Sequence, residues 1–570
     1  MNIVDKLNSL LLQALKDTYK ENYSELDEEF IQSLCFEAGN NPEHGDFSSS
    51  FALKLSKYFK KNPIEIAESV KDNFSNKLIG KVDVIMPGFL NVFLSTETKA
   101  NLLKEVIDNP QSYGKQKPLK QSVLIEFVSS NPTGPLHVGH GRGAVLGSSL
   151  ASLFENAGYE VTTEYYVNDA GRQISILTAS VLLNAYCESF ISDGTYEGAY
   201  IKKLAEAFRN SNEIISISLE SIKSDEDKDK RLDSIISFLS REFPNHWAKA
   251  KEFSVNEIIE LIKEDLGRFG VVHDEWFFES SVGRIDEKGS HLNNGLASIA
   301  ERGLTFQKDG AIWFKTTEFG DDKDRVLVRD NGEPTYFMTD IAYHKNKIDR
   351  KYNLCINIFG ADHHGYVTRI SSAFNALKTK EQKIEVLLYQ LVNLFEDGKQ
   401  KQMSTRRGEF YSLEDLQTEL GADAIKFFFL EKKSDHTMEF DINKAKEANK
   451  NNPYFYTQYA HVRCASILEK GSLGNKLEIL EEDIQNNFSL VSNLIHFPLF
   501  LKKFTEERSP HSLVHYLKEV SSQYHSFYEN YSVLSDNETV TNSRLALTQA
   551  TQIVLNRGLS LLGVKPLMKM

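Results

Sequence analysis

The clearest pattern of apolar and polar positions lies between residues 123 and 167. Residues 123–128 form a largely apolar run with the length of a buried parallel strand. Breaker residues occupy 129–135, and apolar residues then recur at helical spacing as far as Gly158. Residues 161–167 form a second strand-like run. The sequence therefore predicts a strand–loop–helix–strand unit, which leaves backbone N–H groups and the positive end of a helix dipole at the carboxyl edge of a sheet.

The segments before and after this unit have different patterns. Residues 1–110 combine helical patterns with two strand-like runs, 82–86 and 88–94, and predict a separate small α+β domain. From about residue 446 to residue 570 the pattern is helical and predicts an all-α domain. Residues 111–445 are expected to form a Rossmann-type parallel-sheet core, so the fold class is α/β.

Regular periodicity fades inside the predicted core. Residues 190–310 contain helical stretches and a mixed-charge run at 225–231, which is more typical of a solvated face than of a binding patch. We interpret this region as an insertion between two halves of the sheet. The runs 310–314 and 325–329 predict a hairpin that leads back to the core.

Composition narrows the protein class. The chain of 570 residues is 41% hydrophobic and 26% charged, as in ordinary globular proteins, and none of its apolar runs has the length of a membrane span. Its four cysteines are each more than a hundred residues from the next, which favours a reducing cytoplasm over a zinc or disulfide framework. The net charge of −14 argues against a general polyanion binder, so a nucleic-acid partner would need a local basic surface.

The loop of the predicted unit ends in a candidate phosphate site. His137 and His140 lie at the expected sheet edge, where imidazole N–H groups can donate to phosphate oxygens. Gly139 between them leaves room for a flat base against the backbone. The alternatives for the pair are two ordinary loop histidines or half of a metal site.

Two later segments carry further candidate chemistry. The apolar strand 354–359 ends in a polar cluster at 360–365, the usual place for ligand contacts in an open α/β sheet. A loop at 397–408 follows the hydrophobic run 384–395 and carries four cations: Lys399, Lys401, Arg406 and Arg407. We expect this basic loop and the histidine pair to lie on opposite sides of one triphosphate. The alternative for the loop is a solvated basic turn.

Several strings in the chain resemble one known family. Residues 137–140 resemble the "HIGH" box of class I aminoacyl-tRNA synthetases. The longer string EFVSSNPTGPLHVGHGRGAVLG resembles one family of that class, the arginyl-tRNA synthetases. Two further strings are similar to the N-terminal domain of that family: EHGDFSSSFALKLSK and PGFLNVFLS. Two more are similar to its anticodon-binding helical domain: NNPYFYTQYAHVRCASIL and VLNRGLSLLGV.

The resemblance implies an activity. It implies an arginine–tRNA ligase that activates L-arginine with ATP and transfers the arginyl group to the terminal adenosine of tRNA. The three regions 1–110, 111–445 and 446–570 would then be the tRNA-elbow domain, the catalytic domain and the anticodon-binding domain. Mg²⁺ would be held weakly, with ATP, and no protein metal site is expected. The protein would be a cytoplasmic monomer without a membrane partner.

The resemblance also implies roles for individual residues. The implied catalytic residues are His137, His140, Lys401 and Arg406. The implied ATP-binding residues are His137, Gly139, His140, Met403 and Ser404. The implied arginine-binding residues are Glu126, Asn131, Tyr336, Asp340 and Asp362, and tRNA would be bound by Tyr459. The basic loop departs from the family pattern, because Gln402 and Thr405 stand where lysines are usual. This departure leaves open which cation contacts the leaving group.

Three other functions compete with this reading. The chain could be another nucleotidyl-transfer enzyme on the same fold, acting on a different substrate. It could be an RNA-binding protein that has lost catalysis through its altered basic loop. It could, more remotely, be a metal hydrolase that uses His137, His140, His363 and His364.

Overall fold

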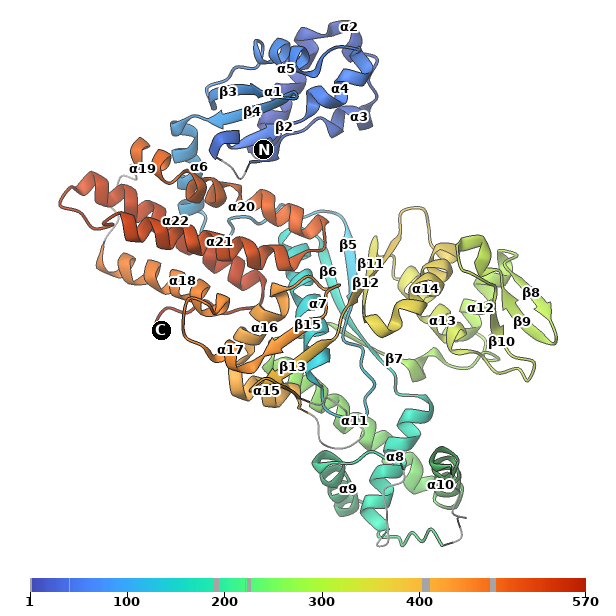
Figure 1. Cartoon of the computed structure of the whole chain (residues 1–570). Coiled ribbons are helices and arrows are strands. Elements are labelled where there is room, and N and C mark those ends of the chain that lie inside the picture. Colours follow the sequence, from blue (N-terminus) through green and yellow to red (C-terminus); the bar gives the residue numbers. More distant parts are fainter. Residues whose placement is uncertain are drawn as a thin grey trace.

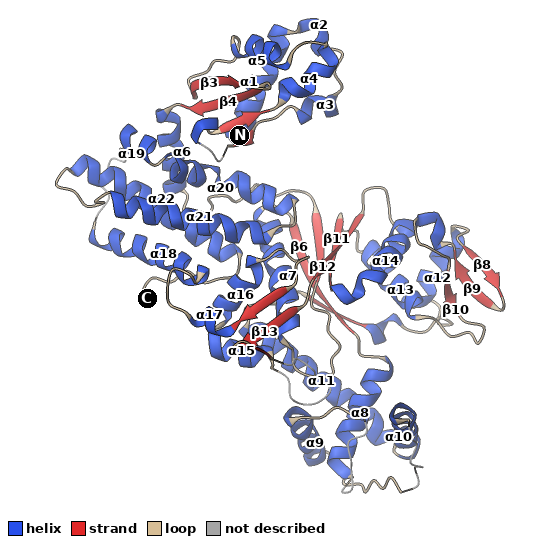
Figure 2. Cartoon of the chain, viewed as in Figure 1, coloured by secondary structure: helices blue, strands red, loops and turns tan. Residues whose placement is uncertain are grey.

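The computed structural model describes residues 3–39, 42–187, 194–220, 222, 227–401, 411–471 and 478–570. A central sheet lies between a helical bundle at the left and one smaller lobe at the right, with a second lobe below it, and the N-terminal residues form a separate body above the bundle (Figure 1). The strands gather into four sheets (Figure 2). This arrangement confirms the predicted fold class, a parallel α/β core between an α+β N-terminal region and an all-α C-terminal region.

The N-terminal region is an antiparallel sheet covered by helices. The strands are ordered β1-β2-β4-β3. Their bounds are β1 (Glu37–Ala38), β2 (Phe47–Ser49), β3 (Ile79–Ile85) and β4 (Phe89–Leu94). The helices are α1 (Ile3–Thr18), α2 (Lys20–Tyr23), α3 (Glu28–Ser33), α4 (Phe51–Phe59) and α5 (Pro63–Lys71), and α6 (Thr96–Asp108) leads away from the sheet. Helix α1 forms because Leu7, Leu11 and Leu15 recur every four residues and are all buried on one face.

A buried ion pair joins this region to the rest of the protein. Asp46 accepts a hydrogen bond from the Leu94 backbone N–H at 2.8 Å, and its Oδ1 lies 2.9 Å from Nζ of Lys99 on α6. Ser492 of the C-terminal bundle donates to the same carboxylate at 3.4 Å. Three segments that are distant in sequence therefore meet at one carboxylate.

The central sheet is entirely parallel. Its strand order is β12-β11-β5-β6-β7. The strands are β5 (Ser122–Glu126), β6 (Glu160–Val167), β7 (Glu275–Phe278), β11 (Leu354–Gly360) and β12 (Lys383–Tyr389). The connecting helices are α7 (Val138–Asn156), α8 (Gly171–Tyr186), α13 (Tyr336–Asp349) and α14 (His364–Leu377). The predicted strand–loop–helix–strand unit is thus confirmed as β5–α7–β6.

The first strand of this unit ends earlier than predicted. Strand β5 stops at Glu126 because Val128 and Ser129 have positive φ angles of 71° and 40°, which turn the chain out of the sheet. Helix α7 then packs closely against this turn. A Cβ at Gly147 would lie 2.1 Å from the Phe127 ring, so only glycine permits this approach.

The inserted region is not continuous, which corrects the sequence prediction. Residues 275–278 return to the central sheet as β7 and pair in parallel with β6. The insertion is therefore divided into two lobes. The first lobe contains α9 (Ala199–Ser211), α10 (Lys228–Glu242) and α11 (Pro244–Arg268). The second contains α12 (His291–Glu301), β8 (Thr305–Lys308), β9 (Ala311–Phe314) and β10 (Arg325–Val328). The predicted hairpin is confirmed as β9–β10, with β8 as a third strand. Strand β7 has only four residues, which is too short for an alternating pattern to be recognised, so the sequence does not predict it.

The remaining chain forms a small sheet and a helical bundle. The small sheet is ordered β14-β13-β15, with β13 (Val392–Glu396), β14 (Lys399–Gln400) and β15 (Met438–Asp441). Near it lie α15 (Leu413–Leu420), α16 (Ala422–Glu431) and α17 (Ile442–Lys446). The bundle contains α18 (Pro453–Lys470), α19 (Glu481–Asn486), α20 (Phe488–Glu506), α21 (Pro510–Asn530) and α22 (Glu538–Leu561). Across the described part of the chain, every helix is too short or too polar to cross a membrane.

Candidate active site

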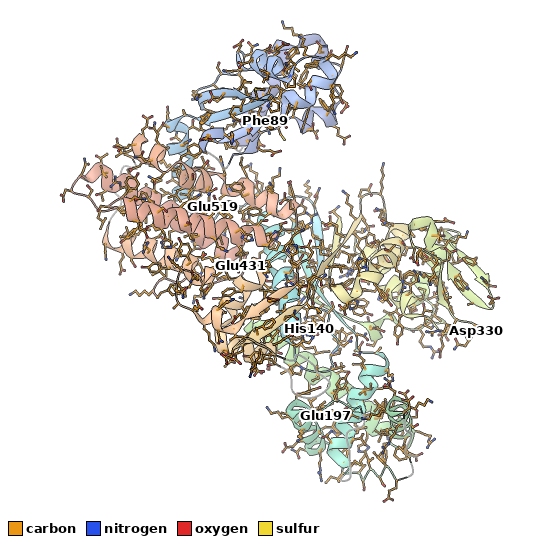
Figure 3. The ribbon with its side chains drawn as sticks, in the orientation of Figure 1. Phe89, His140, Glu197, Asp330, Glu431 and Glu519 are labelled. Atoms are coloured by element: carbon orange, nitrogen blue, oxygen red, sulfur yellow. The ribbon has the colours of Figure 1, made fainter. Side chains whose placement is uncertain are left out.

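One cleft collects most of the predicted site residues. It has a volume of about 630 Å³ and lies at the carboxyl ends of β5, β6 and β11, beside the first turns of α7 and α13. Eight residues singled out from the sequence line it: Glu126, Asn131, His137, Gly139, His140, Tyr336, Asp340 and Asp362. His140 marks this position near the middle of the molecule (Figure 3). The carboxyl edge of a parallel sheet is the place where α/β folds bind ligands.

The two histidines form a mutual cap at the start of α7. His137 Nδ1 accepts from the backbone N–H of His140, and His140 Nδ1 accepts from that of His137. Their rings stack with centroids 3.6 Å apart. Burial lowers the pKa of His137, and it lowers the pKa of His140 further, so both imidazoles are neutral at pH 7. With Nδ1 occupied as an acceptor, each ring carries its proton on Nε2 and can donate it to an anion.

Gly139 keeps the space beside this ring pair open. A Cβ at this position would lie 3.0 Å from Cε1 of His137, closer than real Cβ atoms normally approach. A larger residue would therefore displace the ring that caps the helix.

The segment that follows the basic loop lies beside the histidine pair. Ser412 forms an antiparallel β-bridge with His137, and the Leu413 N–H donates to the Leu136 carbonyl at 2.9 Å. At the other end of the loop, Lys401 Nζ lies 2.5 Å from Oε2 of Glu396. The predicted residues Met403, Ser404 and Arg406, like Gln402 and Thr405, lie outside the described residues.

Two acidic side chains with raised pKa values, Asp340 and Glu279, line the same cleft. Asp340 lies one turn into α13, and burial, with Glu279 and Glu126 nearby, raises its pKa to about 8, although Arg369 acts in the other direction. Burial also raises the pKa of Glu279, whose Oε2 accepts from the Tyr166 hydroxyl at 2.9 Å. Among the described residues neither carboxyl group forms an ion pair, and two such acids favour a ligand that brings positive charge.

Glu279 is a functional candidate that the sequence did not reveal. It begins η2 (Glu279–Val282), directly after β7, and lines the cleft. Only recognition of β7 as a strand of the central sheet would have placed Glu279 at the carboxyl edge. A short strand and a single glutamate supply no such signal.

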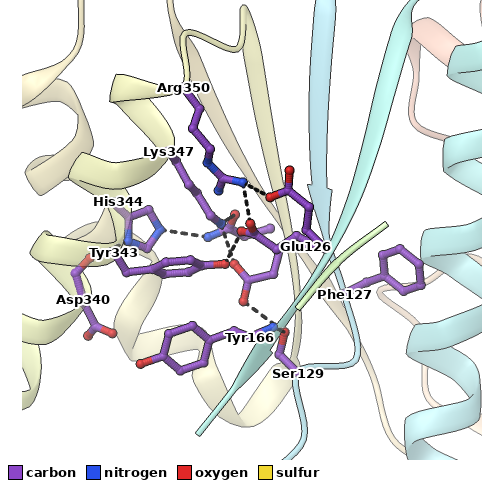
Figure 4. Close-up of polar contacts among 12 residues, drawn as sticks. Glu126, Phe127, Ser129, Tyr166, Asp340, Tyr343, His344, Lys347 and Arg350 are labelled. Carbon is purple, nitrogen blue, oxygen red and sulfur yellow. Dashed lines mark hydrogen bonds and ion pairs between the residues drawn. The ribbon is translucent and has the colours of Figure 1, made fainter. Parts of the chain in front are cut away.

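Glu126 lies at the end of β5 and is fully engaged by protein groups. Its Oε1 accepts from the Ser129 hydroxyl at 3.1 Å, and its Oε2 lies 2.5 Å from Nζ of Lys347 (Figure 4). Glu126 and Lys347 are both buried. The cleft therefore combines one ion-paired acid, Glu126, with two acids whose pKa values are raised, Asp340 and Glu279.

Three predicted residues occupy the rim of the cleft. Tyr336 is 67% exposed at the first position of α13. Asn131 donates from its amide to Oε1 of Gln173 at 2.8 Å. The Asp362 side chain is 75% exposed and lies 3.5 Å from the His363 imidazole. These residues can contact a ligand from the rim, but they do not form the buried part of the cleft.

Tyr459 lies far from the cleft, on α18 of the helical bundle. It is 40% exposed, and Arg463 lies over its ring at 4.6 Å. His525 stacks on the ring with a centroid distance of 5.6 Å. An exposed aromatic ring braced by a cation is suited to stacking on a base.

The described residues of the cleft do not form a metal-binding site. Within the described residues, no three His, Cys, Asp or Glu side chains are arranged to hold a metal. The groups that line the cleft are instead neutral imidazoles and carboxyl groups, which suit an anion and an organic cation respectively.

Family models match almost the whole chain. The model described as "Arginyl tRNA synthetase N terminal domain" matches residues 5–94. The model "tRNA synthetases class I (R), catalytic domain" matches residues 102–452, and "DALR anticodon binding domain" matches residues 457–570.

Named relatives and solved structures agree with these models. The chain is 38% identical to the arginine–tRNA ligase of Vesicomyosocius okutanii, over 98% of each chain. It is also 38% identical to that of Legionella pneumophila strain Corby, over 97% of this chain and 98% of the relative. A putative arginyl-tRNA synthetase structure from Campylobacter jejuni is 32% identical, with a TM-score of 0.71, over 84% of this chain and 100% of that one. The arginyl-tRNA synthetase of Thermus thermophilus shares the fold over 100% of both chains, with a TM-score of 0.76 at 22% identity.

Proposed function

The chain belongs to the arginyl-tRNA synthetase family, and from this premise we propose that it is an arginine–tRNA ligase. It activates L-arginine with ATP to arginyl-adenylate and transfers the arginyl group to the 3′-terminal adenosine of its tRNA. One observation carries the proposal: the carboxyl groups of Asp340 and Glu279 and the imidazoles of His137 and His140 line the same cleft. Arginine and a triphosphate are the ligands that match these two kinds of group.

Arginine recognition begins with the guanidinium. This group is planar, permanently charged and carries five donors, so it matches carboxylates held at fixed positions. Asp340 and Glu279 receive it, and its charge favours ionisation of both acids. Tyr336 and Asp362 also line the cleft, and Glu126 and Asn131 receive the α-amino end of the substrate.

The chemical step is an in-line displacement at phosphorus. The arginine carboxylate attacks the α-phosphorus of ATP and pyrophosphate leaves, so the protein positions the reactants and stabilises charge. His137 and His140 donate from Nε2 to phosphate oxygens, and Gly139 leaves space for the nucleotide. Met403 and Ser404 would bind ATP from the basic loop, with Lys401 and Arg406 as its cations. The bridge between Ser412 and His137 supports an approach of that loop to the same triphosphate.

Mg²⁺ fits this site as an ion carried by ATP. The cleft supplies no set of carboxylates arranged around a cation, among the residues that the structure describes, so phosphate oxygens and water would be the ligands. When bound, the ion neutralises charge on the leaving pyrophosphate.

The tRNA partner is assigned to three parts of the chain. Residues 1–110 bind the elbow of the tRNA, residues 111–445 receive its acceptor end, and residues 446–570 bind the anticodon, with Tyr459 stacking on a base. We further propose that the protein acts as a monomer in the cytoplasm.

Charging of total tRNA with each amino acid in turn tests this function. We expect charging with arginine alone, together with arginine-dependent ATP–pyrophosphate exchange. Charging with another amino acid would indicate a different nucleotidyl-transfer enzyme. Binding of tRNA without any charging would indicate an RNA-binding protein that has lost catalysis.

Arginine binding should depend on pH through Asp340. Because the pKa of Asp340 is raised to about 8 from 3.8, this carboxyl group is mostly protonated at pH 7 in the free protein, whereas the guanidinium binds the ionised form. The affinity for arginine should therefore rise by up to about tenfold per pH unit below about pH 8 and level off above it. Calorimetric titration in two buffers with different ionisation enthalpies measures the affinity and the released proton. An affinity that stays flat between about pH 6 and about pH 8 would contradict this linkage.

Replacement of Tyr459 should weaken tRNA binding alone. Loss of one stacked base costs roughly 1–3 kcal/mol, so Tyr459→Ala should raise the KM for tRNA by about tenfold. The KM values for ATP and arginine should not change. Leu534→Ala, at a 39% exposed residue of the same bundle, is the matched control. An unchanged KM for tRNA in Tyr459→Ala would remove this residue from the interface.

A further inference from the structure

A buried lysine lies directly behind the substrate cleft. Lys347 is on α13, seven residues after Asp340, and its side chain is 0% exposed. Its Nζ lies 2.5 Å from Oε2 of Glu126 and 2.8 Å from Oδ1 of Asn357 (Figure 4). The two acceptors are register partners on neighbouring parallel strands, β5 and β11. Lys347 therefore connects one helix with the last residue of β5 and the middle of β11.

The hydrogen bonds around Lys347 continue to the backbone of Asp340. The Asn357 amide donates to Nε2 of His344 at 2.9 Å, and Nδ1 of His344 donates to the Asp340 carbonyl at 2.8 Å. Burial and the charge of Lys347 lower the pKa of His344 to about 3, so this ring is neutral, as one donor and one acceptor require. Each link therefore joins a donor to an acceptor, and the links form a continuous network from Glu126 to Asp340.

The surroundings exclude Lys347 from direct contact with a ligand. Its ammonium lies 4.3 Å from the centroid of the Tyr343 ring, which covers it. The Tyr343 hydroxyl in turn donates to Oε1 of Glu164 at 2.6 Å, and Arg350 lies 2.6 Å from the other oxygen of that carboxylate. A fully enclosed cation can act on substrate only through the groups that it holds.

We propose that Lys347 is a positioning residue for arginine: it fixes the carboxylate of Glu126 in the orientation that receives the α-amino group of the substrate. The inference rests on the proposed function. Without Lys347, Glu126 would be a buried carboxylate without a countercharge, and Ser129 alone would hold it. The guanidinium end would be affected less, because His344 and Asn357 still hold the Asp340 backbone.

Replacement by the uncharged, similarly shaped methionine tests the role. Lys347→Met should raise the KM for arginine in ATP–pyrophosphate exchange by about 30-fold while leaving the KM for ATP within about threefold. The control is Lys345→Met, which removes a lysine that pairs with Asp349 on the same helix outside the cleft. An arginine KM within about threefold of wild type in Lys347→Met would overturn the proposal.

A substrate analogue separates positioning from general damage. 5-Guanidinopentanoic acid is arginine without its α-amino group, so it cannot use Glu126. Its inhibition constant should change less than about threefold in Lys347→Met, whereas the arginine KM rises. Equal weakening of both compounds would mean that Lys347 supports the whole cleft, and the specific assignment would then be wrong.

A double-mutant cycle keeps the test decisive if Lys347→Met does not fold. The variant Glu126→Gln/Lys347→Met contains no buried charge at this pair and should unfold at a temperature close to that of wild type. Because Lys347 acts through Glu126, the arginine KM of the double variant should equal that of Glu126→Gln alone. If the two substitutions instead raise the arginine KM by the product of their separate effects, the inference is contradicted. If wild type does not charge tRNA with arginine, the proposed function fails and this inference fails with it; if only the variant results disagree, the inference alone fails.

Discussion

Asp340→Asn is expected to remove most arginine activation while leaving the protein folded. The variant loses the charge that receives the guanidinium in a desolvated site, and such losses cost about 2–5 kcal/mol, or about 30-fold to several-thousandfold in kcat/KM for arginine. The KM for ATP should stay near the wild-type value, because His137 and His140, not Asp340, receive the triphosphate. ATP–pyrophosphate exchange and tRNA charging measure both effects.

The stability of Asp340→Asn provides an internal check. The folded-state pKa of Asp340, about 8, lies above the unfolded value of 3.8, so the folded protein prefers the protonated form. Stability is then lost as pH rises between these two values, and asparagine removes this loss. The variant should therefore unfold at neutral pH no more easily than wild type. Asp349→Asn, at an exposed position of the same helix, is the matched control for activity. Near-normal arginine charging by Asp340→Asn would contradict the proposed guanidinium site.

His140→Ala is expected to slow the chemical step rather than weaken arginine binding. In the proposed function its Nε2–H donates to charge that develops on the phosphates, and removal of one such donor costs about 10²–10³ in kcat. The KM for arginine should change less than about threefold. His137→Ala should act in the same direction. Single-turnover formation of the adenylate measures the step directly.

The two histidine variants should also lose stability, because each ring caps the N-terminus of α7. Each ring also accepts the other residue's backbone N–H, so each alanine variant should lower the free energy of unfolding by about 0.5–2 kcal/mol. Thermal unfolding separates this loss from the loss of kcat. His436→Ala, at an exposed histidine outside the cleft, should change neither quantity. Retention of kcat within tenfold in both alanine variants would contradict the phosphate role.

Local sequence was sufficient for the elements that have a strong period or a distinctive motif. The β5–α7–β6 unit, helix α1 and the β9–β10 hairpin follow from side-chain periodicity and turn residues, which act over a few neighbouring positions. The candidates His137, His140 and Asp340 could be named because the strings that contain them resemble a family, and all three line the cleft. The basic-loop candidates stay predictions, since residues 402–410 lie outside the described part of the chain.

Other features depended on contacts between distant residues. Asp46 is buried in contact with Lys99 and Ser492, which are distant from it in sequence. The residues next to Asp46 in the chain give no indication of this contact. Glu279 reaches the cleft only because β7 adds to the edge of β6.

The sequence by itself determined the order of elements, the motif-bearing loop and the fold class of this protein. The tertiary structure decided which charges are compensated. Lys347 neutralises Glu126 across 221 positions of sequence, whereas Asp340 and Glu279 form no ion pair within the described residues. The physical reason is that the cost of a buried charge depends on its neighbours in space, and only folding brings those neighbours together.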